Sequence, residues 1–180
     1  WDFSLVDPDN RRPVDYELRM QLLAELRALV AGSGPDLGAI VRSLLQTPAD
    51  GRLKLFVTWR TLQMRREHLE LFRDGDYLPL VAAGARKENV VAYARRSGGA
   101  AVIVVVGRLF AGLVAEPDDI PLGETTWGDT FVDCTFLPTG ACPFNALTGR
   151  TAPLMDGRLL LRDVFADFPA GLLFCQAGHG

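Results

Sequence analysis

The hydrophobic period of this 180-residue chain changes once, between residues 73 and 77, and this change constrains the fold more than any other feature. Up to residue 73, apolar side chains recur at spacings of three and four, which is typical of amphipathic helices. From Tyr77 onward, short runs of β-branched and aromatic residues alternate with turn residues, which is typical of strands. The sequence therefore predicts an α+β protein in which helices precede an antiparallel β-module.

Three helical segments are predicted in the first part of the chain. The first begins near Pro13, which suits a first helical turn, and ends at the GSGP sequence of residues 32–35. It carries one apolar stripe of four leucines: Leu18, Leu22, Leu26 and Leu29. A shorter segment covers 36–45 and stops before Pro48, and the longest helix is predicted over 53–72.

Seven strand-like runs are predicted in the second part, and roughly seven short antiparallel strands favour a small sandwich. The runs are 77–82, 89–96, 100–107, 129–136, 143–149, 158–165 and 170–177. Hairpin turns are predicted at 95–100, 148–150 and 155–158 because of their glycines. The run 100–107 is apolar on both faces, so we expect it to be a central strand.

Composition limits the possible partners. The chain has a net charge of −3 and no block of like charge, so we expect no nucleic-acid partner. The longest apolar run, 100–106, is far shorter than the ~20 residues of a membrane helix, so we expect a soluble protein without a membrane partner. Cys134 and Cys175 lie in apolar runs and are predicted to be buried free thiols in the cytoplasm. With only His68 and His179 as histidines, we expect no metal and no cofactor.

The acidic pairs of the chain have mostly structural or solvated interpretations. These pairs are Asp7/Asp9, Glu67/Glu70, Asp118/Asp119 and Asp163/Asp167.

The sequence DPDNRR at 7–12 leaves two interpretations open. One is a tight turn closed by internal Asp–Arg pairs. The other is a polar cluster facing a cleft, where carboxylates and guanidinium forks bind sugar hydroxyls.

Two long stretches of the chain carry a family resemblance. WDFSLVDPDNRRPVDYELR at 1–19 and DGRLKLFVTWRTLQMRREHLELFRDGDYLPL at 50–80 resemble the maltooligosyl trehalose synthases of the α-amylase superfamily, glycoside hydrolase family 13. The likeness continues through VVAYARR, WGDT, LTGR and DVFADFPAGLL. It departs from the family pattern within 132–150, where the strand limits are therefore open.

The resemblance implies a division of the chain. Residues 1–75 would be the helical end of a (β/α)8 catalytic barrel, made of the loop after the last strand and the final helices. Residues 76–180 would be an antiparallel β-sandwich domain at the C-terminus. Trp1 is no translation start, so we expect the chain to be the C-terminal piece of a longer enzyme.

The resemblance also implies an activity. The family converts the reducing-end α-1,4 linkage of a maltooligosaccharide into an α,α-1,1 linkage, in the biosynthesis of trehalose. The catalytic acids of the family would lie upstream of Trp1, so no residue here is expected to be catalytic and the chain alone should be inactive. The residues expected to contact the sugar or shape the cleft are Asp7, Asp9, Asn10, Arg11, Arg12 and Lys54. The expected partners are the maltooligosaccharide and the upstream part of the enzyme. Without that upstream part the leucine stripe of the first helix would be exposed, so a dimer of the chain is also possible.

Two other functions remain open from the sequence. The β-module could be a non-catalytic carbohydrate-binding or scaffold module, in which exposed aromatic side chains such as Trp127 and Tyr93 stack on sugar rings. The parent protein could also be an α-glucan hydrolase of the same superfamily. The DPDNRRPVDY sequence at 7–16 favours the synthase over the hydrolase.

Overall fold

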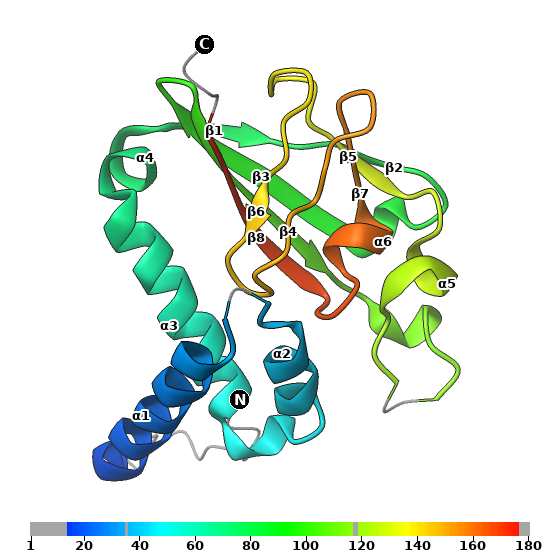
Figure 1. The fold of residues 1–180 in the computed structure, drawn as a ribbon. Helices are drawn as coiled ribbons and strands as arrows, with labels where there is room; N and C mark the ends of the chain where they lie inside the picture. Colours follow the sequence, from blue (N-terminus) through cyan, green and yellow to red (C-terminus); the bar gives the residue numbers. More distant parts are fainter. Residues whose placement is uncertain (1–13, 35, 117–118, 177–180) are drawn as a thin grey trace, which may run out of the picture.

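The helices come first in the chain, as predicted. A computed structural model describes residues 14–34, 36–116 and 119–176 (Figure 1). Its first part holds α1 (Tyr16–Gly32), α2 (Gly38–Leu45), α3 (Arg52–Glu67) and α4 (Leu69–Asp74), with a single 3-10 turn at Pro48–Asp50. The helix α1 begins where the Asp15 carboxylate accepts a hydrogen bond from the Leu18 N–H at 2.8 Å.

The strands form two antiparallel sheets. The order in the larger sheet is β1 (Asp76–Pro79), β3 (Val90–Ser97), β4 (Ala100–Gly107), β8 (Ala170–Gln176) and β6 (Phe144–Asn145). The smaller sheet has the order β2 (Ala82–Ala83), β5 (Phe131–Asp133) and β7 (Arg158–Leu160). In β4, Val104 lies opposite both Tyr93 of β3 and Leu172 of β8. The α+β class, the antiparallel sheets and the central place of 100–107 are thus confirmed.

Several predicted strands are shorter than expected. The runs 129–136 and 143–149 keep only three and two strand residues, in β5 and β6. The run 158–165 is wrong in its second half, where β7 is followed by the short helix α6 (Leu161–Val164). There Leu161 and Val164 are both buried, which the helical spacing of three allows, whereas a continued strand would point them to opposite faces. The helix α5 (Gly123–Trp127) was not expected.

The tightest hairpin turns follow from their residues. Between β3 and β4, Gly98 and Gly99 have φ of 55° and 84°, values that favour glycine. The turn before β7 has Asp156 at 53° and Gly157 at 75°, and Met155 and Arg158 exchange both backbone hydrogen bonds across it. Both turns confirm the prediction, because positive φ at two central residues matches the twist of a hairpin.

The helix predicted over 53–72 is broken at His68. This residue has φ −122° and ψ 45°, outside the helical region, and separates α3 from α4. Its imidazole stacks on Phe174 of β8, with ring centroids 3.9 Å apart and planes 17° apart. The prediction of one continuous helix is wrong here. The spacing of apolar residues along the sequence reports only local structure, and the contact of His68 with Phe174 is between distant residues.

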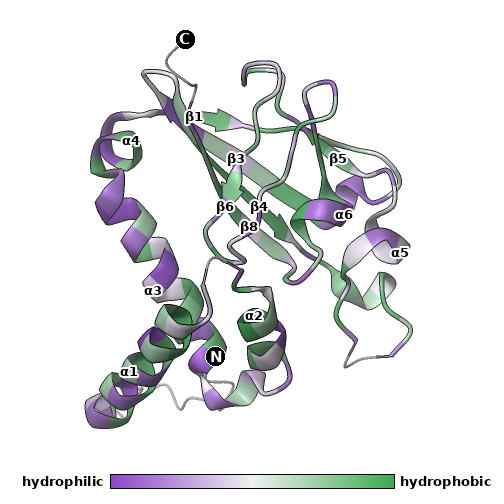
Figure 2. Cartoon of the chain, viewed as in Figure 1, coloured by the Kyte–Doolittle hydropathy of each residue, from purple (hydrophilic) through white to green (hydrophobic). Residues whose placement is uncertain are grey.

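The larger sheet is covered on both faces. Along β4, Val102 packs with the apolar residues of α1 to α4, while Ile103 and Val105 pack with residues of the smaller sheet such as Val132 and Leu159. Figure 1 shows the helices on one side of the larger sheet and β2, β5 and β7 on the other. Figure 2 shows the matching pattern, with hydrophobic colour along the central strands and mixed colour on α1 and α3.

The leucine stripe of α1 is only half covered. Leu26 is fully buried against the other helices, but Leu18 and Leu29 are 49% and 51% exposed. The helical part therefore presents apolar surface that no described residue covers.

Candidate functional site

The residues expected to contact sugar are almost all outside the described ranges. Asp7, Asp9, Asn10, Arg11 and Arg12 fall in this group. The sixth, Lys54, lies in the first turn of α3 with an exposed side chain. Its role in sugar binding remains a prediction.

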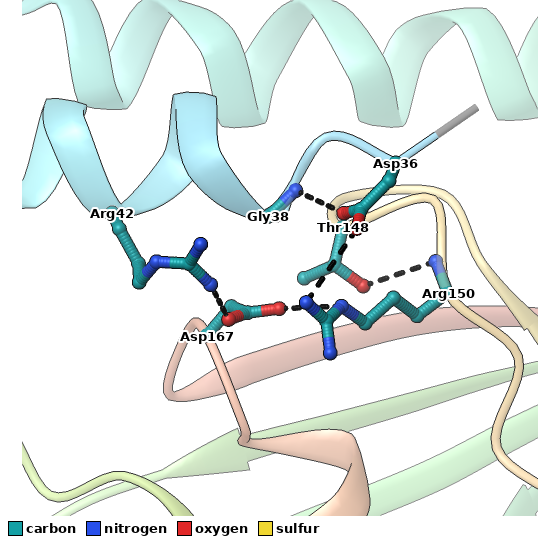
Figure 3. A network of polar contacts seen from close by, with 6 residues as sticks. All are labelled: Asp36, Gly38, Arg42, Thr148, Arg150 and Asp167. Atoms are coloured by element: carbon teal, nitrogen blue, oxygen red, sulfur yellow. Dashed lines mark hydrogen bonds and ion pairs between the residues drawn. The ribbon is translucent and has the colours of Figure 1, made fainter. Parts of the chain in front are cut away.

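The structure instead brings together a polar network at the junction of α2 and the larger sheet (Figure 3). At its centre is Asp167, which precedes β8 and is 4% exposed. Arg42 of α2 donates a hydrogen bond to Oδ1 of this carboxylate. The Arg150 Nε lies 2.8 Å from Oδ2, but its N–H is not aligned with that oxygen, so this contact is an ion pair without a hydrogen bond. Two guanidinium groups therefore neutralise one buried carboxylate.

A second aspartate closes the network at the start of α2. The Asp36 Oδ1 accepts a hydrogen bond from the Gly38 N–H at 2.9 Å, and its Oδ2 lies 3.6 Å from Nη2 of Arg150. The backbone N–H of Leu37 donates to the Thr148 carbonyl at 2.8 Å. Gly38 leaves no room for a side chain, because a Cβ there would lie 2.5 Å from Oδ2 of Asp167.

The loop after β6 holds Arg150 in place. The buried Asn145 side chain accepts hydrogen bonds from the N–H groups of Leu147 and Leu172, at 3.0 and 3.3 Å, which ties the loop to β8. The Arg150 carbonyl then accepts from the Asn145 N–H at 2.7 Å. The larger sheet thus fixes Arg150, while Arg42 belongs to α2. Because both arginines contact Asp167, the network joins α2 to the larger sheet.

This network is suited to positioning and not to acid–base chemistry. The Asp167 carboxylate is buried and lies between Arg42 and Arg150, whereas a general acid must reach the group to which it gives its proton. Asp163, its expected partner in an acidic pair, is exposed on α6. The sequence analysis interpreted Asp163 and Asp167 as structural or solvated. It did not predict that Asp167 pairs with Arg42 and Arg150, which lie 125 and 17 positions before it in the sequence.

The cysteines have the expected burial. Cys134 and Cys175 are buried free thiols, and Cys142 is exposed. Burial raises the pKa of Cys134 to about 12 and also raises the pKa of Cys175. Within 14–34, 36–116 and 119–176, no three His, Cys, Asp or Glu side chains form a group that could hold a metal ion.

One aromatic candidate for sugar stacking is excluded. Trp127 is 1% exposed, its Nε1 donates to the Pro121 carbonyl at 2.9 Å, and its ring meets that of Phe165 edge-on. Its side chain is therefore part of the core.

None of the helices in the described ranges is long and apolar enough to cross a membrane.

Comparison with known proteins gives a consistent result. The chain is 36% identical over 173 residues to putative maltooligosyl trehalose synthases of two Mycobacterium tuberculosis strains, CDC 1551 and H37Rv, covering 96% of this chain. The chain spans 17% of the length of these curated relatives, in their C-terminal part. Its fold matches a mutant of maltooligosyltrehalose synthase from Arthrobacter ramosus with a TM-score of 0.65 and 35% identity, over 98% of this chain and 19% of that one. No protein-family model matches the chain.

Proposed function

Since the chain is homologous to a C-terminal part of maltooligosyl trehalose synthase, we propose that it is the C-terminal part of a (1→4)-α-D-glucan 1-α-D-glucosylmutase. The parent enzyme would convert the reducing-end α-1,4 linkage of maltooligosaccharides into an α,α-1,1 linkage. The observation that carries this proposal is the 36% identity over 96% of the chain. Such an enzyme is an isomerase of trehalose biosynthesis, acts in the cytoplasm and needs no cofactor.

The proposal includes a role for each part of the chain. Residues 1–75 form the helical end of a (β/α)8 barrel, and residues 76–180 form a C-terminal β-sandwich. The shared core between the larger and smaller sheets supports the sandwich, because Ile103 and Val105 of one sheet pack with Val132 and Leu159 of the other. The packing of all four helices on the opposite face of the larger sheet supports their assignment to a separate helical part, the end of the barrel.

In this assignment the chain contributes to the substrate cleft and not to bond breaking. Loops after the barrel strands build the active-site face, and Asp7, Asp9, Asn10, Arg11 and Arg12 would lie on the last of these loops. Lys54, at the start of α3, would lie at the same end. Such a wall would exclude water, so that the glucosyl-enzyme is captured by the anomeric hydroxyl of the sugar and is not hydrolysed.

The polar network supports this division of labour. It joins α2 to the larger sheet through Arg42, Asp167 and Arg150, and α2 in turn packs with α3, which carries Lys54. A fixed wall matters because small displacements of positioning groups reduce rates strongly.

The experiment compares two proteins on a linear maltooligosaccharide. One is this chain, and the other is the same chain joined to the N-terminal part of its enzyme. Reducing ends should disappear only with the longer protein, because an α,α-1,1 linkage has no free anomeric carbon. A rise in reducing ends would mean a hydrolase, and no change in either sample would contradict both activities.

A further inference from the structure

A small hollow lies on the helix-bearing face of the larger sheet, beside α4 and near the β1 edge, and the proposed function gives it no role. It encloses about 270 Å³ and is lined by six residues: Phe72, Tyr77, Tyr93, Arg95, Val102 and Val104. The strand register explains their convergence, because Tyr77 lies opposite Arg95, Arg95 opposite Val102, and Tyr93 opposite Val104. Side chains opposite one another share a face of the sheet, so β1, β3 and β4 all contribute to the hollow.

Two tyrosine rings form its exposed wall. The rings of Tyr77 and Tyr93 have centroids 5.2 Å apart and planes tilted by 31°, so together they form a shallow curved platform. Tyr77 is 58% exposed and Tyr93 is half-buried. Because both side chains stand on paired strands, the platform is held ready before any ligand binds, which lowers the entropy cost of binding.

A cation lies at the rim of the hollow. The Arg95 Nη2 donates to the carbonyl of Phe72 in α4 at 2.6 Å, which fixes the guanidinium beside the platform. A guanidinium has five N–H donors, and with the described part of the chain Arg95 makes this one hydrogen bond. Its remaining donors are available to hydroxyl groups of a ligand.

We propose that this hollow, the tyrosine platform, binds glucosyl residues of an α-1,4-glucan. A pyranose ring has an apolar face of C–H groups, which packs on an aromatic ring, and a rim of hydroxyls, which accept hydrogen bonds from Arg95. The chain of an α-1,4-glucan is curved, as is the platform. The choice of this glucan rests on the proposed function, since maltooligosaccharides would be the substrates of the parent enzyme.

The chemistry of the hollow favours a sugar over a protein partner. Its exposed wall consists of tyrosines, which combine a flat apolar ring with a hydroxyl, and its rim carries a charged donor.

The test is an NMR titration of the 180-residue chain with maltoheptaose, with a cello-oligosaccharide as the linkage control. We expect saturable binding with a Kd of about 1 mM for the α-linked sugar alone. Tyr77→Ala and Tyr93→Ala should each weaken binding about tenfold, while Tyr77→Phe keeps the ring and most of the affinity. Tyr16→Ala is the matched control, because Tyr16 is 70% exposed on α1 and should have no effect.

The outcomes separate this proposal from the proposed function. Absence of binding, equal binding of both sugars, or binding that survives Tyr77→Ala and Tyr93→Ala overturns it. So does a change in association state by light scattering in Tyr77→Ala without any sugar signal, since that outcome assigns the hollow to a protein partner. Circular dichroism of each variant excludes unfolding as the cause of lost binding. If the reducing-end assay fails while platform binding is found, the activity is overturned and the glucan site stands.

Discussion

At the scale of single residues, Gly38 shows how one missing side chain permits a buried ion pair. A Cβ at this position would lie 2.5 Å from Oδ2 of Asp167 and 3.0 Å from Oδ1 of Asp36. The Asp167 carboxylate is buried and paired with both Arg42 and Arg150, so it has little room to withdraw.

Gly38→Ala should therefore lower the free energy of unfolding by about 1–2 kcal/mol, because the overpacking exceeds the gain in helix propensity. The measurement is urea denaturation at neutral pH. Gly32→Ala is the matched control, since Gly32 ends α1 with nothing within 4 Å of the added Cβ, and it should leave stability unchanged or higher. A Gly38→Ala variant as stable as Gly32→Ala would show that the carboxylate can move aside.

The three thiols should differ sharply in reactivity. Only thiolates react quickly, and burial raises the pKa of Cys134 to about 12 and that of Cys175 above its usual range. At pH 8 we expect Ellman's reagent to modify one thiol per native chain, the exposed Cys142, and all three in denaturant. Cys142→Ser should abolish the native reaction. Reaction of Cys134 in the native chain at the denatured rate would contradict its burial.

At the scale of elements, the polar network fixes α2 on the larger sheet, and its strength comes from the burial of Asp167 between Arg42 and Arg150. Asp167→Asn should lower the free energy of unfolding by about 1–2 kcal/mol. We expect less than the cost of a fully buried pair, because both arginine side chains are about half exposed. Amide hydrogen exchange should also become faster over residues 38–45, since the variant loosens the helix that the pair holds.

The matched control for Asp167→Asn is an exposed ion pair. Arg73 and Asp74 are paired at 2.7 Å with both side chains more than half exposed to solvent, so Arg73→Gln should leave the free energy of unfolding unchanged. It should leave exchange in 38–45 unchanged. Protection of α2 that is equal in Asp167→Asn and Arg73→Gln would show that the network does not hold the helix.

The elements also show what a sequence can predict and what it cannot. The β3–β4 hairpin was predictable because its signals are local: alternating residues, two glycines, then a run apolar on both faces. The break at His68 and the link between α2 and Asp167 were not, because the contacts His68–Phe174 and Arg42–Asp167 join residues more than a hundred positions apart. The cluster Asp7 to Arg12 stays a prediction, since it lies outside the described residues. Tyr93 was considered from the sequence, but its partner Tyr77 emerged only from the register of β1 and β3.

At the scale of the whole molecule, the helical part and the sheets differ in how completely they are covered. The larger sheet has a core on each face. The helices expose leucines on two neighbouring elements, with Leu18 and Leu29 of α1 at 49% and 51% and Leu62 of α3 at 55% exposure. In the proposed enzyme this surface would face the upstream part of the barrel, which the 180-residue chain does not supply.

The isolated chain should therefore self-associate through its helices, because grouped apolar side chains on a surface favour protein contacts. We expect light scattering to give a mass near that of a dimer that falls toward the monomer on dilution. Replacing Leu18, Leu29 and Leu62 together by glutamine should give a monomer at all concentrations. As the matched control, glutamine at Val81 and Met155, which are 72% and 57% exposed near the smaller sheet, should leave the dimer intact. Addition of the upstream part of the enzyme should dissociate the dimer, since both would occupy the same helical surface. A monomeric wild-type chain over the whole concentration range would contradict this use of the leucines.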